Sequence, residues 1–429
     1  MMGRKVWGGM LERCLWTETS PLPRFPAAPL PASTDVAIIG GGYTGLAAAR
    51  TLARGGTDVT VLERHHLGWG ASGRNGGFVL QGYKPEMEEL ARMVGPERAR
   101  RMFQLTLEAM QFLERLITEE EIACDFTRCG ALTLAAKASH LPSLEQSGRF
   151  LRRELGYETE LLSREDMGRE IGSTRYHGAL LDPGGCSLQP AKYVRGLGLA
   201  TGRAGARLME NTEVTRVSRV AGGFEVGTSR GMVRAREVLA ATNGYTPAAL
   251  GRLRRRVIPI GSYIIATKPL GEELARRLIP KGRVMSDTKN LLYYFRLSPD
   301  GRMVFGGRAS FTPPSTKRSA AILASGMGEV FPELAGATIE YAWSGKVAYP
   351  MDHLPHAGRL DGVHYSMGYC GHGVALATYL GTRMGEVLLG TGEVPDLGGK
   401  RFKAIPFFTG FPWFLPFVGG YYRTRDWLS

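Results

Sequence analysis

The chain has 429 residues, which is too many for one ordinary hydrophobic core and predicts two domains. Its hydrophobic content of 43% and aromatic content of 9% exclude a disordered chain. The net charge of +14 comes from arginine-rich clusters that are short, scattered and not interleaved with aromatic residues, so we expect a solvated basic surface and no specific nucleic-acid site.

Residues 1–29 form an N-terminal lead-in that carries positive charge but no continuous apolar stretch. No later run reaches the roughly 18 apolar residues of a membrane span, so we predict neither a secretory signal nor a transmembrane segment. The cysteines are odd in number and scattered, which favours reduced thiols over a disulfide framework. We therefore expect a cytoplasmic protein.

The first predicted elements form one βαβ unit in residues 35–63. A β-branched strand, a helix rich in Leu and Ala, and an alternating strand follow one another as Val36–Ile39, Leu46–Arg54 and Asp58–Leu62. Gly40, Gly42 and Gly45 make the pattern G-x-G-x-x-G between the first strand and the helix, and Glu63 follows the second strand. Strand, glycines, helix and acid together are the dinucleotide-binding fingerprint.

Each residue type in the fingerprint has a physical reason. Gly40 permits a tight turn, Gly42 lets the backbone approach a pyrophosphate, and Gly45 lets helix and strand pack closely. The helix N-terminus supplies unpaired N–H groups and the positive end of its dipole. Glu63 can accept hydrogen bonds from ribose hydroxyls. The fingerprint alone does not distinguish NAD from FAD.

A glycine-rich loop, GWGASGRNGG, occupies residues 68–77, where an NAD-binding unit usually continues with another helix. Gly73, Gly76 and Gly77 would let backbone N–H groups approach a large planar ring system, and Arg74 and Asn75 add donors. The loop therefore predicts a cradle for the flavin half of FAD. A mobile surface loop is the alternative reading of the same spacing.

The two glycine motifs resemble the D-amino-acid-oxidase-like (DAO) family of FAD-dependent oxidoreductases, and within it the γ-glutamylputrescine oxidase-like branch. Three further segments carry the resemblance, namely CLWTETSP (14–21), REVLAATNGYTP (236–247) and GYCGHGV (368–374). The resemblance implies that main-chain groups at Val214 meet the adenine. It also favours His372 as a donor at the start of a helix predicted from about Val374 to Leu389, whose N-terminus would stabilise negative charge on the reduced flavin.

Together these segments give the candidate cofactor-binding residues. They are Gly40, Gly42, Tyr43, Thr44, Gly45, Glu63, Arg64, Gly70, Ala71, Ser72, Arg74, Asn75, Gly76, Gly77, Val214, Gly371, His372, Gly373 and Val374.

The resemblance also implies the fold class, which is α/β (α+β overall) with a Rossmann-type FAD-binding domain and an inserted substrate domain built on an antiparallel sheet. The FAD-binding domain is expected to be discontinuous, over residues 30–112, 180–245 and 338–395. The substrate domain is expected over 113–179 and 246–337, where alternating segments are typical of such a sheet.

The segment WSGKVAYPMDHLP (343–355) carries the prediction about substrate. Covalent-flavin relatives use a cysteine near Gly345, which this chain lacks, so the resemblance implies non-covalent FAD. Glycine oxidases place an arginine for the substrate carboxylate at the position of Val347. The departure argues against a simple amino-acid oxidase, and Lys346 and Arg308 are the alternative partners for a substrate carboxylate.

The predicted reaction is oxidation of a C–N bond of an amine, such as an acylated polyamine, by hydride transfer to the flavin, with O2 or a quinone-type molecule as acceptor. The candidate catalytic residues are His372, Tyr293, Tyr294 and Arg308, and the candidate substrate-binding residues are Tyr263, Arg296 and Lys346. The alternatives are an amino-acid or N-methyl-amino-acid oxidase and a non-catalytic FAD-binding protein. No metal site is predicted, and a homo-oligomer is left open.

Residues 396–429 form an aromatic, proline-rich tail. Proline interrupts any amphipathic helix there, so we expect the tail to pack on its own domain or on a partner subunit, with membrane contact as the alternative.

Overall fold

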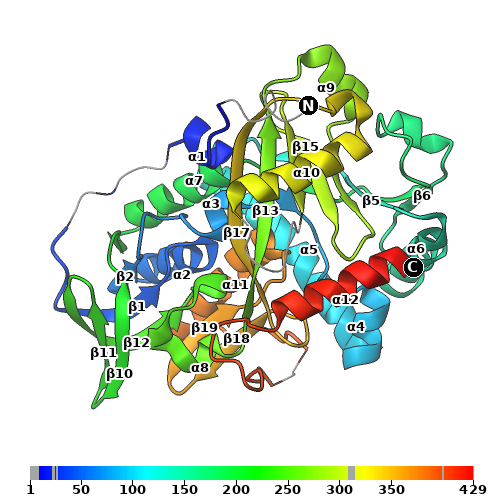
Figure 1. Cartoon of the computed structure of the whole chain (residues 1–429). Coiled ribbons are helices and arrows are strands. Elements are labelled where there is room, and N and C mark those ends of the chain that lie inside the picture. The colour runs from blue at the N-terminus through cyan, green and yellow to red at the C-terminus, as the bar shows by residue number, and fades with distance from the viewer. Residues whose placement is uncertain (1–8, 22–24, 26–27, 308–314, 399–400, 429) are drawn as a thin grey trace.

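The computed structural model describes residues 9–21, 25, 28–307, 315–398 and 401–428, and it arranges them around two eight-stranded sheets (Figure 1). One sheet has a parallel core and the other is mostly antiparallel. The predicted fold class is confirmed: a Rossmann-type unit is joined to a second unit built on an antiparallel sheet.

The first sheet is built around the fingerprint. Its order is β10-β11-β12-β1-β2-β9, and β19 pairs with β12 and β18. The strands of the parallel core are β1 (Ser33–Ile39), β2 (Val59–Leu62), β9 (Arg207–Met209), β12 (Gly231–Ala240) and β19 (Val363–Met367). The antiparallel margin consists of β10 (Val214–Val220), β11 (Gly223–Thr228) and β18 (His356–Leu360). β1 lies between β2 and β12, in the parallel core of the sheet.

Long helices cover this sheet. They are α2 (Tyr43–Arg54), α5 (Pro96–Glu119), α7 (Pro190–Arg203) and α11 (Gly373–Leu389). α2 is rich in Ala and Leu, which favour helix, and nearly all of its length is buried. A Cβ on Gly381 of α11 would lie 2.3 Å from the backbone oxygen of Thr44 in α2, so only glycine permits the close contact of these two helices.

The second sheet has the order β17-β13-β16-β15-β14-β5-β7-β6. Its strands are β5 (Ala131–Leu134), β6 (Glu160–Leu162), β7 (Ala179–Asp182), β13 (Ile258–Thr267), β14 (Val284–Asp287), β15 (Tyr293–Leu297), β16 (Met303–Gly307) and β17 (Ile339–Tyr349). Helix α10 (Thr316–Val330) packs on it over a core that includes Phe295, Phe305 and Phe331.

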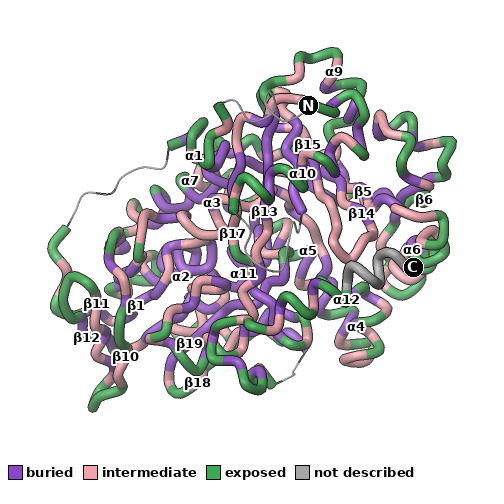
Figure 2. The backbone as a smooth tube through the Cα atoms, viewed as in Figure 1, coloured by how far each residue is buried: buried purple, intermediate pink, exposed green. Residues whose placement is uncertain are grey.

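Two strands of the second sheet lie in segments that the predicted division places in the FAD-binding domain. β17 pairs with β13 along its length, although residues 338–349 were assigned to that domain, and β7 pairs with β5, although residues 180–182 were. Figure 2 shows the buried backbone concentrated in the strands of both sheets and in the helices that face them, while β10 and α9 (Glu272–Leu278) are mostly exposed.

The remaining helices and strands join these layers. They are α1 (Leu15–Thr19), α3 (Ala71–Arg74), β3 (Phe78–Val79), α4 (Met87–Val94), β4 (Thr127–Arg128), α6 (Leu141–Leu155), β8 (Cys186–Ser187), α8 (Gly251–Arg254) and α12 (Leu415–Leu428). α12 crosses one face of the molecule toward α4 and α6 (Figure 1).

Candidate active site

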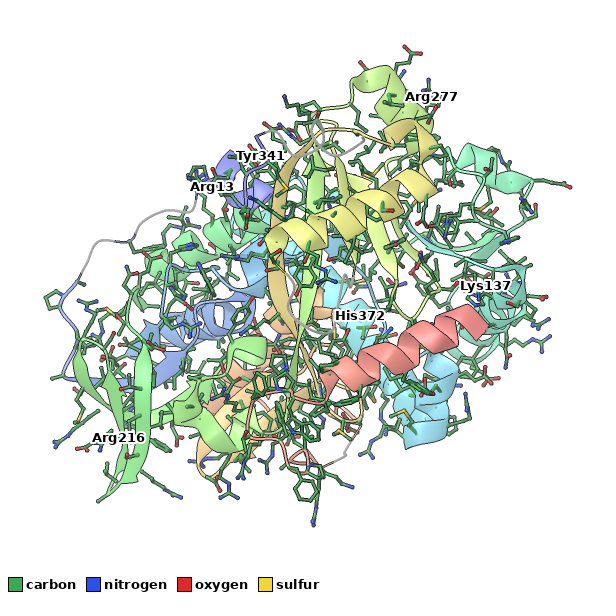
Figure 3. All side chains as sticks on the ribbon, viewed as in Figure 1. Arg13, Lys137, Arg216, Arg277, Tyr341 and His372 are labelled. Atoms are coloured by element: carbon green, nitrogen blue, oxygen red, sulfur yellow. The ribbon has the colours of Figure 1, made fainter. Side chains whose placement is uncertain are left out.

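A cavity of about 370 Å³ lies where the carboxyl ends of β1 and β2 meet the second sheet. Its lining also includes residues of the loop at 68–76, of the start of α11 and of strands β13, β15 and β17. A cavity of this size at the carboxyl edge of a parallel sheet is the usual position of a ligand site in such folds. Figure 3 labels His372 in the middle of the molecule, between the two sheets.

The turn from β1 into α2 forms one wall of the cavity. Gly40 has a φ of +106°, which L side chains rarely adopt, and a Cβ on Gly45 would lie 2.0 Å from the oxygen of Gly40. Gly42 precedes α2 and has no side chain to cap it, and the Ser72 hydroxyl accepts a hydrogen bond from the backbone amide of Tyr43 at 3.0 Å. The positive end of α2 therefore faces the cavity, which suits a phosphate group.

Glu63 is held in place at the end of β2. One carboxylate oxygen accepts a hydrogen bond from the backbone amide of Gly41 at 2.8 Å, and the other accepts one from His65 at 2.9 Å. Each oxygen retains a further acceptor position, and the side chain lines the cavity. Glu63 is thus oriented to accept two neighbouring hydroxyl groups.

The glycine-rich loop is fixed by two tryptophans from distant parts of the chain. The indole of Trp16 in the N-terminal lead-in donates to the oxygen of Asn75 at 2.9 Å, and that of Trp343 in β17 donates to the oxygen of Arg74 at 2.8 Å. The Arg74 guanidinium packs over the ring of Trp69 and donates to its backbone oxygen. These contacts hold the loop, so the mobile-loop alternative is wrong.

His372 precedes α11, whose N-terminus no side chain caps. Its Nδ1 atom is buried and has no hydrogen-bond partner among the described residues. Burial and, to a smaller extent, the positive charge of Lys84 lower the pKa of His372 from 6.5 to about 4. The imidazole is therefore neutral at pH 7, and it lines the cavity together with the positive end of α11.

The second sheet provides the opposite wall. The Tyr294 hydroxyl lies 2.9 Å from the Ser262 hydroxyl, and both residues line the cavity. Apolar side chains from the neighbouring strands complete this wall, among them Ile260, Val347 and Tyr349. The wall offers a mainly apolar surface with a few fixed hydroxyl groups, as small-molecule sites commonly do.

A second, more polar cavity of about 250 Å³ adjoins the first, and Lys346 lines both. Arg64 and Arg254 also line the second cavity. Burial first, and then the charges of these two arginines, lower the pKa of Lys346. The Lys346 backbone amide donates to the Tyr245 hydroxyl at 2.9 Å, which ties β17 to the segment after β12.

The candidate cofactor-binding residues converge on the first cavity, and all of them line it except Gly45 and Gly77. Gly45 lies behind the turn, where it allows the close packing described above. A Cβ on Gly77 would lie 2.2 Å from the oxygen of Leu188, so this glycine fits the loop against the chain behind it.

Three candidates on the second sheet need correction. Tyr263 and Tyr293 point to the opposite face of the sheet, where both join the hydrophobic core beneath α10. Arg296 shares the inward face with Tyr294 but lies beyond the cavity, fully buried, where it donates to the oxygen of Gly77 at 3.0 Å. Successive strand residues alternate between faces, and the sequence did not reveal which face was inward. Arg308 lies outside the described residues.

Several lining residues escaped the sequence analysis. They are Trp69, Lys84, Tyr245, Ile260, Tyr349 and Tyr369. Trp69 lies in the glycine-rich loop at 68–77 and Tyr245 in the segment 236–247. Both segments were predicted to approach the cofactor, so these two residues could have been included. Lys84 lies in a loop without any motif, and nothing in the sequence marks it.

The residues present fit FAD. Glycines form the turn at Gly40 and Gly42, the positive ends of α2 and α11 border the cavity, and a fixed carboxylate stands at Glu63. The unpartnered Nδ1 atom of His372 adds a polar group that a ligand can satisfy.

Within the described ranges, no three His, Cys, Asp or Glu side chains gather as a metal ion would require. The same residues contain no helix that is long and apolar enough to cross a bilayer. All five cysteines are free thiols, and four of them are buried.

Comparisons with known proteins agree with this geometry. Residues 35–387 match the family model described as FAD dependent oxidoreductase (DAO). The gamma-glutamylputrescine oxidoreductase of Escherichia coli (strain K12) is 34% identical over 400 residues, covering 92% of this chain and 93% of the relative. The probable oxidoreductase OrdL of Rhizobium meliloti (strain 1021) is 34% identical over 404 residues, covering 91% and 94%. The structure of glycine oxidase from Geobacillus kaustophilus is similar in fold, with a TM-score of 0.73, 20% identity, and coverage of 88% of this chain and all of that chain.

Proposed function

The chain belongs to the DAO family of FAD-dependent oxidoreductases, and we propose that it oxidises the carbon–nitrogen bond of an amine whose reacting carbon bears no carboxylate. The candidate substrate is γ-glutamylputrescine or a similar acylated polyamine. The 34% identity to a gamma-glutamylputrescine oxidoreductase over most of both chains supports this substrate. Membership of an enzyme family sets aside the non-catalytic alternative.

FAD, when bound, would supply the acceptor for the hydride that leaves the carbon beside the substrate nitrogen. The chain's own residues bind and orient the substrate. Ile260, Val347 and Tyr349 exclude water from the apolar wall, and the hydroxyls of Ser262 and Tyr294 give fixed polar contacts. The imine product hydrolyses in water to an aldehyde and an ammonium or amine. Because the protein contributes mainly orientation, remote parts of the substrate should affect the rate as well as the affinity.

The observation that carries the proposal is Val347. It lies on β17 opposite Ile260 of β13, and both side chains line the cavity. An α-carboxylate bound there would face apolar carbon without a bidentate guanidinium partner, which is costly for a charged group. A substrate whose reacting carbon bears no carboxylate does not have this cost.

Replacing Val347 tests this assignment directly. We expect Val347→Arg to slow flavin reduction by γ-glutamylputrescine at least about tenfold and to speed reduction by glycine and sarcosine, because a guanidinium would then meet their carboxylate. Val347→Leu keeps the wall apolar and serves as the control, with the amine preference retained. An unchanged ratio of amine to amino-acid rates in Val347→Arg would refute the role of this position.

An amino-acid or N-methyl-amino-acid oxidase is the second candidate. Lys346 favours it, because this cation borders both cavities and can pair with a carboxylate. Its ammonium group packs near the ring of Tyr245, 5.7 Å from the centroid, and is a point charge rather than a bidentate fork. The apolar neighbourhood of Val347 therefore favours the amine.

We further propose that FAD is bound non-covalently, since Gly345 offers no thiol at the position where covalent relatives attach the flavin. The acceptor of the electrons is O2 or a quinone-type molecule. Free thiols at all five cysteines support a reducing, cytoplasmic setting. The discontinuous domain division given above remains part of this proposal, with β17 contributing to the wall of the substrate domain.

A further inference from the structure

The C-terminal tail exposes an unusual amount of aromatic surface. Its exposed side chains are Phe407 (92%), Phe411 (71%), Trp413 (55%), Phe417 (75%) and Tyr421 (61%). Large aromatic side chains gathered in one exposed segment often mark an interaction site.

The same tail is firmly attached to the protein through other residues. Ile405, Phe408 and Leu415 are buried. The backbone amide of Ile405 donates to the oxygen of Arg255 at 2.8 Å, and the Arg256 guanidinium donates to the oxygen of Phe402 at 2.8 Å. The expectation that the tail packs on its own protein thus holds for one set of its side chains, while a second set points outward.

The residues beneath and beside the exposed rings are basic. Residues 252–256 (RLRRR) contain four arginines, and the stretch 238–271 around them contains no Asp or Glu. The tail from 397 to 425 also lacks acidic residues and includes the exposed Arg401 and Lys403. Two acids lie near this cluster: Asp361 pairs with Arg252 at 2.7 Å, and Glu213 lines the second cavity together with Arg254. We call the surface formed by these residues the aromatic-basic face; it consists of Phe407, Phe411, Trp413, Phe417, Tyr421, Arg255, Arg401 and Lys403.

The charge of the face selects its occupant. In a two-fold contact with a second copy, the same cations would oppose one another, which disfavours self-association. A bilayer with anionic headgroups matches both features, because aromatic rings insert at the headgroup level and Arg and Lys attract the lipid phosphates. The rings protrude instead of lining either cavity described above, as insertion into lipid requires. We propose that the aromatic-basic face binds the surface of an anionic lipid membrane.

This face is connected to the candidate active site. Leu415, Phe414 and Val418 of the tail pack in one hydrophobic cluster with Val347 and Tyr349 of the cavity wall. On α12, Phe417 and Tyr421 stand four residues apart and therefore share one side of the helix. A membrane bound to that side would lie against the element that covers the cavity wall. The proposal itself stands on the exposed rings and charges and does not depend on the proposed substrate.

Vesicle co-sedimentation of the purified FAD-bound chain tests the proposal. The probes are phosphatidylcholine vesicles and vesicles with about one-third phosphatidylglycerol. We expect binding to the anionic vesicles that weakens as salt is raised, and little binding to the neutral ones. Phe407→Ser/Phe411→Ser should lower the partition coefficient at least about tenfold, because two inserted rings are lost. Quenching of tryptophan fluorescence by brominated lipid should decrease in Trp413→Phe.

Matched controls separate this face from general effects. Leu161→Ser/Met232→Ser removes two exposed apolar side chains from β6 and β12 and should bind like the wild type. Arg401→Glu/Lys403→Glu should weaken binding to the anionic vesicles. Arg216→Glu/Arg219→Glu makes the same charge change on β10, whose Arg216 is labelled far from α12 in Figure 3, and should bind like the wild type. The visible flavin spectrum checks that each variant is folded.

Three results would overturn the proposal. The first is equal or absent binding of the wild type to both kinds of vesicle. The second is unchanged binding after the tail substitutions. The third is a dimer in light scattering that Phe407→Ser/Phe411→Ser dissociates, which would make the face a contact between copies.

Discussion

Glu63 combines two tasks in one side chain. Its carboxylate fixes the backbone of the glycine turn through Gly41 and its own strand end through His65, and it still faces the cavity. A group already oriented by the protein loses little entropy when it binds a ligand hydroxyl, so its contribution to affinity should be large for its size.

Substitution of Glu63 is therefore the first residue-scale prediction. Glu63→Gln removes the charge from these hydrogen bonds and should weaken FAD binding by about 1.5–3 kcal/mol, or roughly 10- to 150-fold in Kd. Fluorescence titration of the apoprotein with FAD measures the change. Glu210→Gln is the control, since Glu210 accepts the amide of Leu67 at 2.8 Å but does not line the cavity. Equal losses in both variants would show that only backbone support is at work.

His372 makes a prediction about pH. Its pKa lies near 6.5 in the unfolded chain and at about 4 in the folded protein, because burial and Lys84 disfavour the imidazolium. As the pH falls, the unfolded chain therefore binds this proton before the folded protein does. The contribution of His372 to the free energy of unfolding is complete above pH 6.5 and is lost as the pH falls toward 4. At pH 5 the loss from this residue should be about 2 kcal/mol relative to pH 8.

Denaturant unfolding of the wild type and of His372→Gln at both pH values measures this contribution. The free energy of unfolding should fall less between pH 8 and pH 5 in the variant, by about 2 kcal/mol. If both proteins lose the same stability over this interval, the imidazole is not held neutral by the cavity.

Only some residues of the candidate site could be predicted from the sequence. Motif residues such as Gly40 and Glu63 were predictable, because glycine spacing and an acid after a strand follow from backbone geometry and ligand chemistry. Tyr293 and Tyr294 are neighbours of the same type, and only the register of β15 decides that Tyr294 faces the cavity. Lys84 approaches His372 through tertiary contact alone, which no local pattern encodes.

Among the elements, those of the first sheet were the most predictable. The helix expected from about Val374 to Leu389 is α11, which is one residue longer. The helix expected at Leu46–Arg54 begins earlier, at Tyr43, since the helix includes the last glycine of the fingerprint. β17 was harder, because a long strand can pair with either sheet and only its register with β13 settles the choice.

The C-terminal helix α12 lies against the cavity wall through Leu415, and this contact gives the element-scale prediction. Leu415→Ala should destabilise the docked tail by about 2 kcal/mol or more, because a buried leucine loses its packing. The tail should then open more often, and limited proteolysis within it should become about 30-fold faster or more.

Phe407→Ala provides the comparison for α12. The Phe407 side chain is almost fully exposed, so its removal should leave the rate of tail cleavage unchanged. Cleavage at the same rate in Leu415→Ala and the wild type would mean that Leu415 does not anchor the tail.

At the scale of the whole molecule, the chain passes back and forth between two sheets and places the cavity between them. The fingerprint predicted the first sheet from local signals. The N-terminal lead-in shows what local signals omit: Leu11 pairs with Tyr341 and Trp16 bonds to Asn75, so residues from one end of the chain fix a loop and a strand far along it. The resemblance to a family included the segment 14–21, but only the folded protein shows which contacts this segment makes.

The central claim is that this chain oxidises an amine with the FAD held in this cavity. Anaerobic mixing of the purified protein with candidate substrates, followed by the loss of visible flavin absorbance, tests it most directly. We predict that γ-glutamylputrescine or a similar acylated diamine reduces the flavin faster than glycine, sarcosine or D-alanine. Faster reduction by any of these small amino acids than by every amine tested would contradict the account.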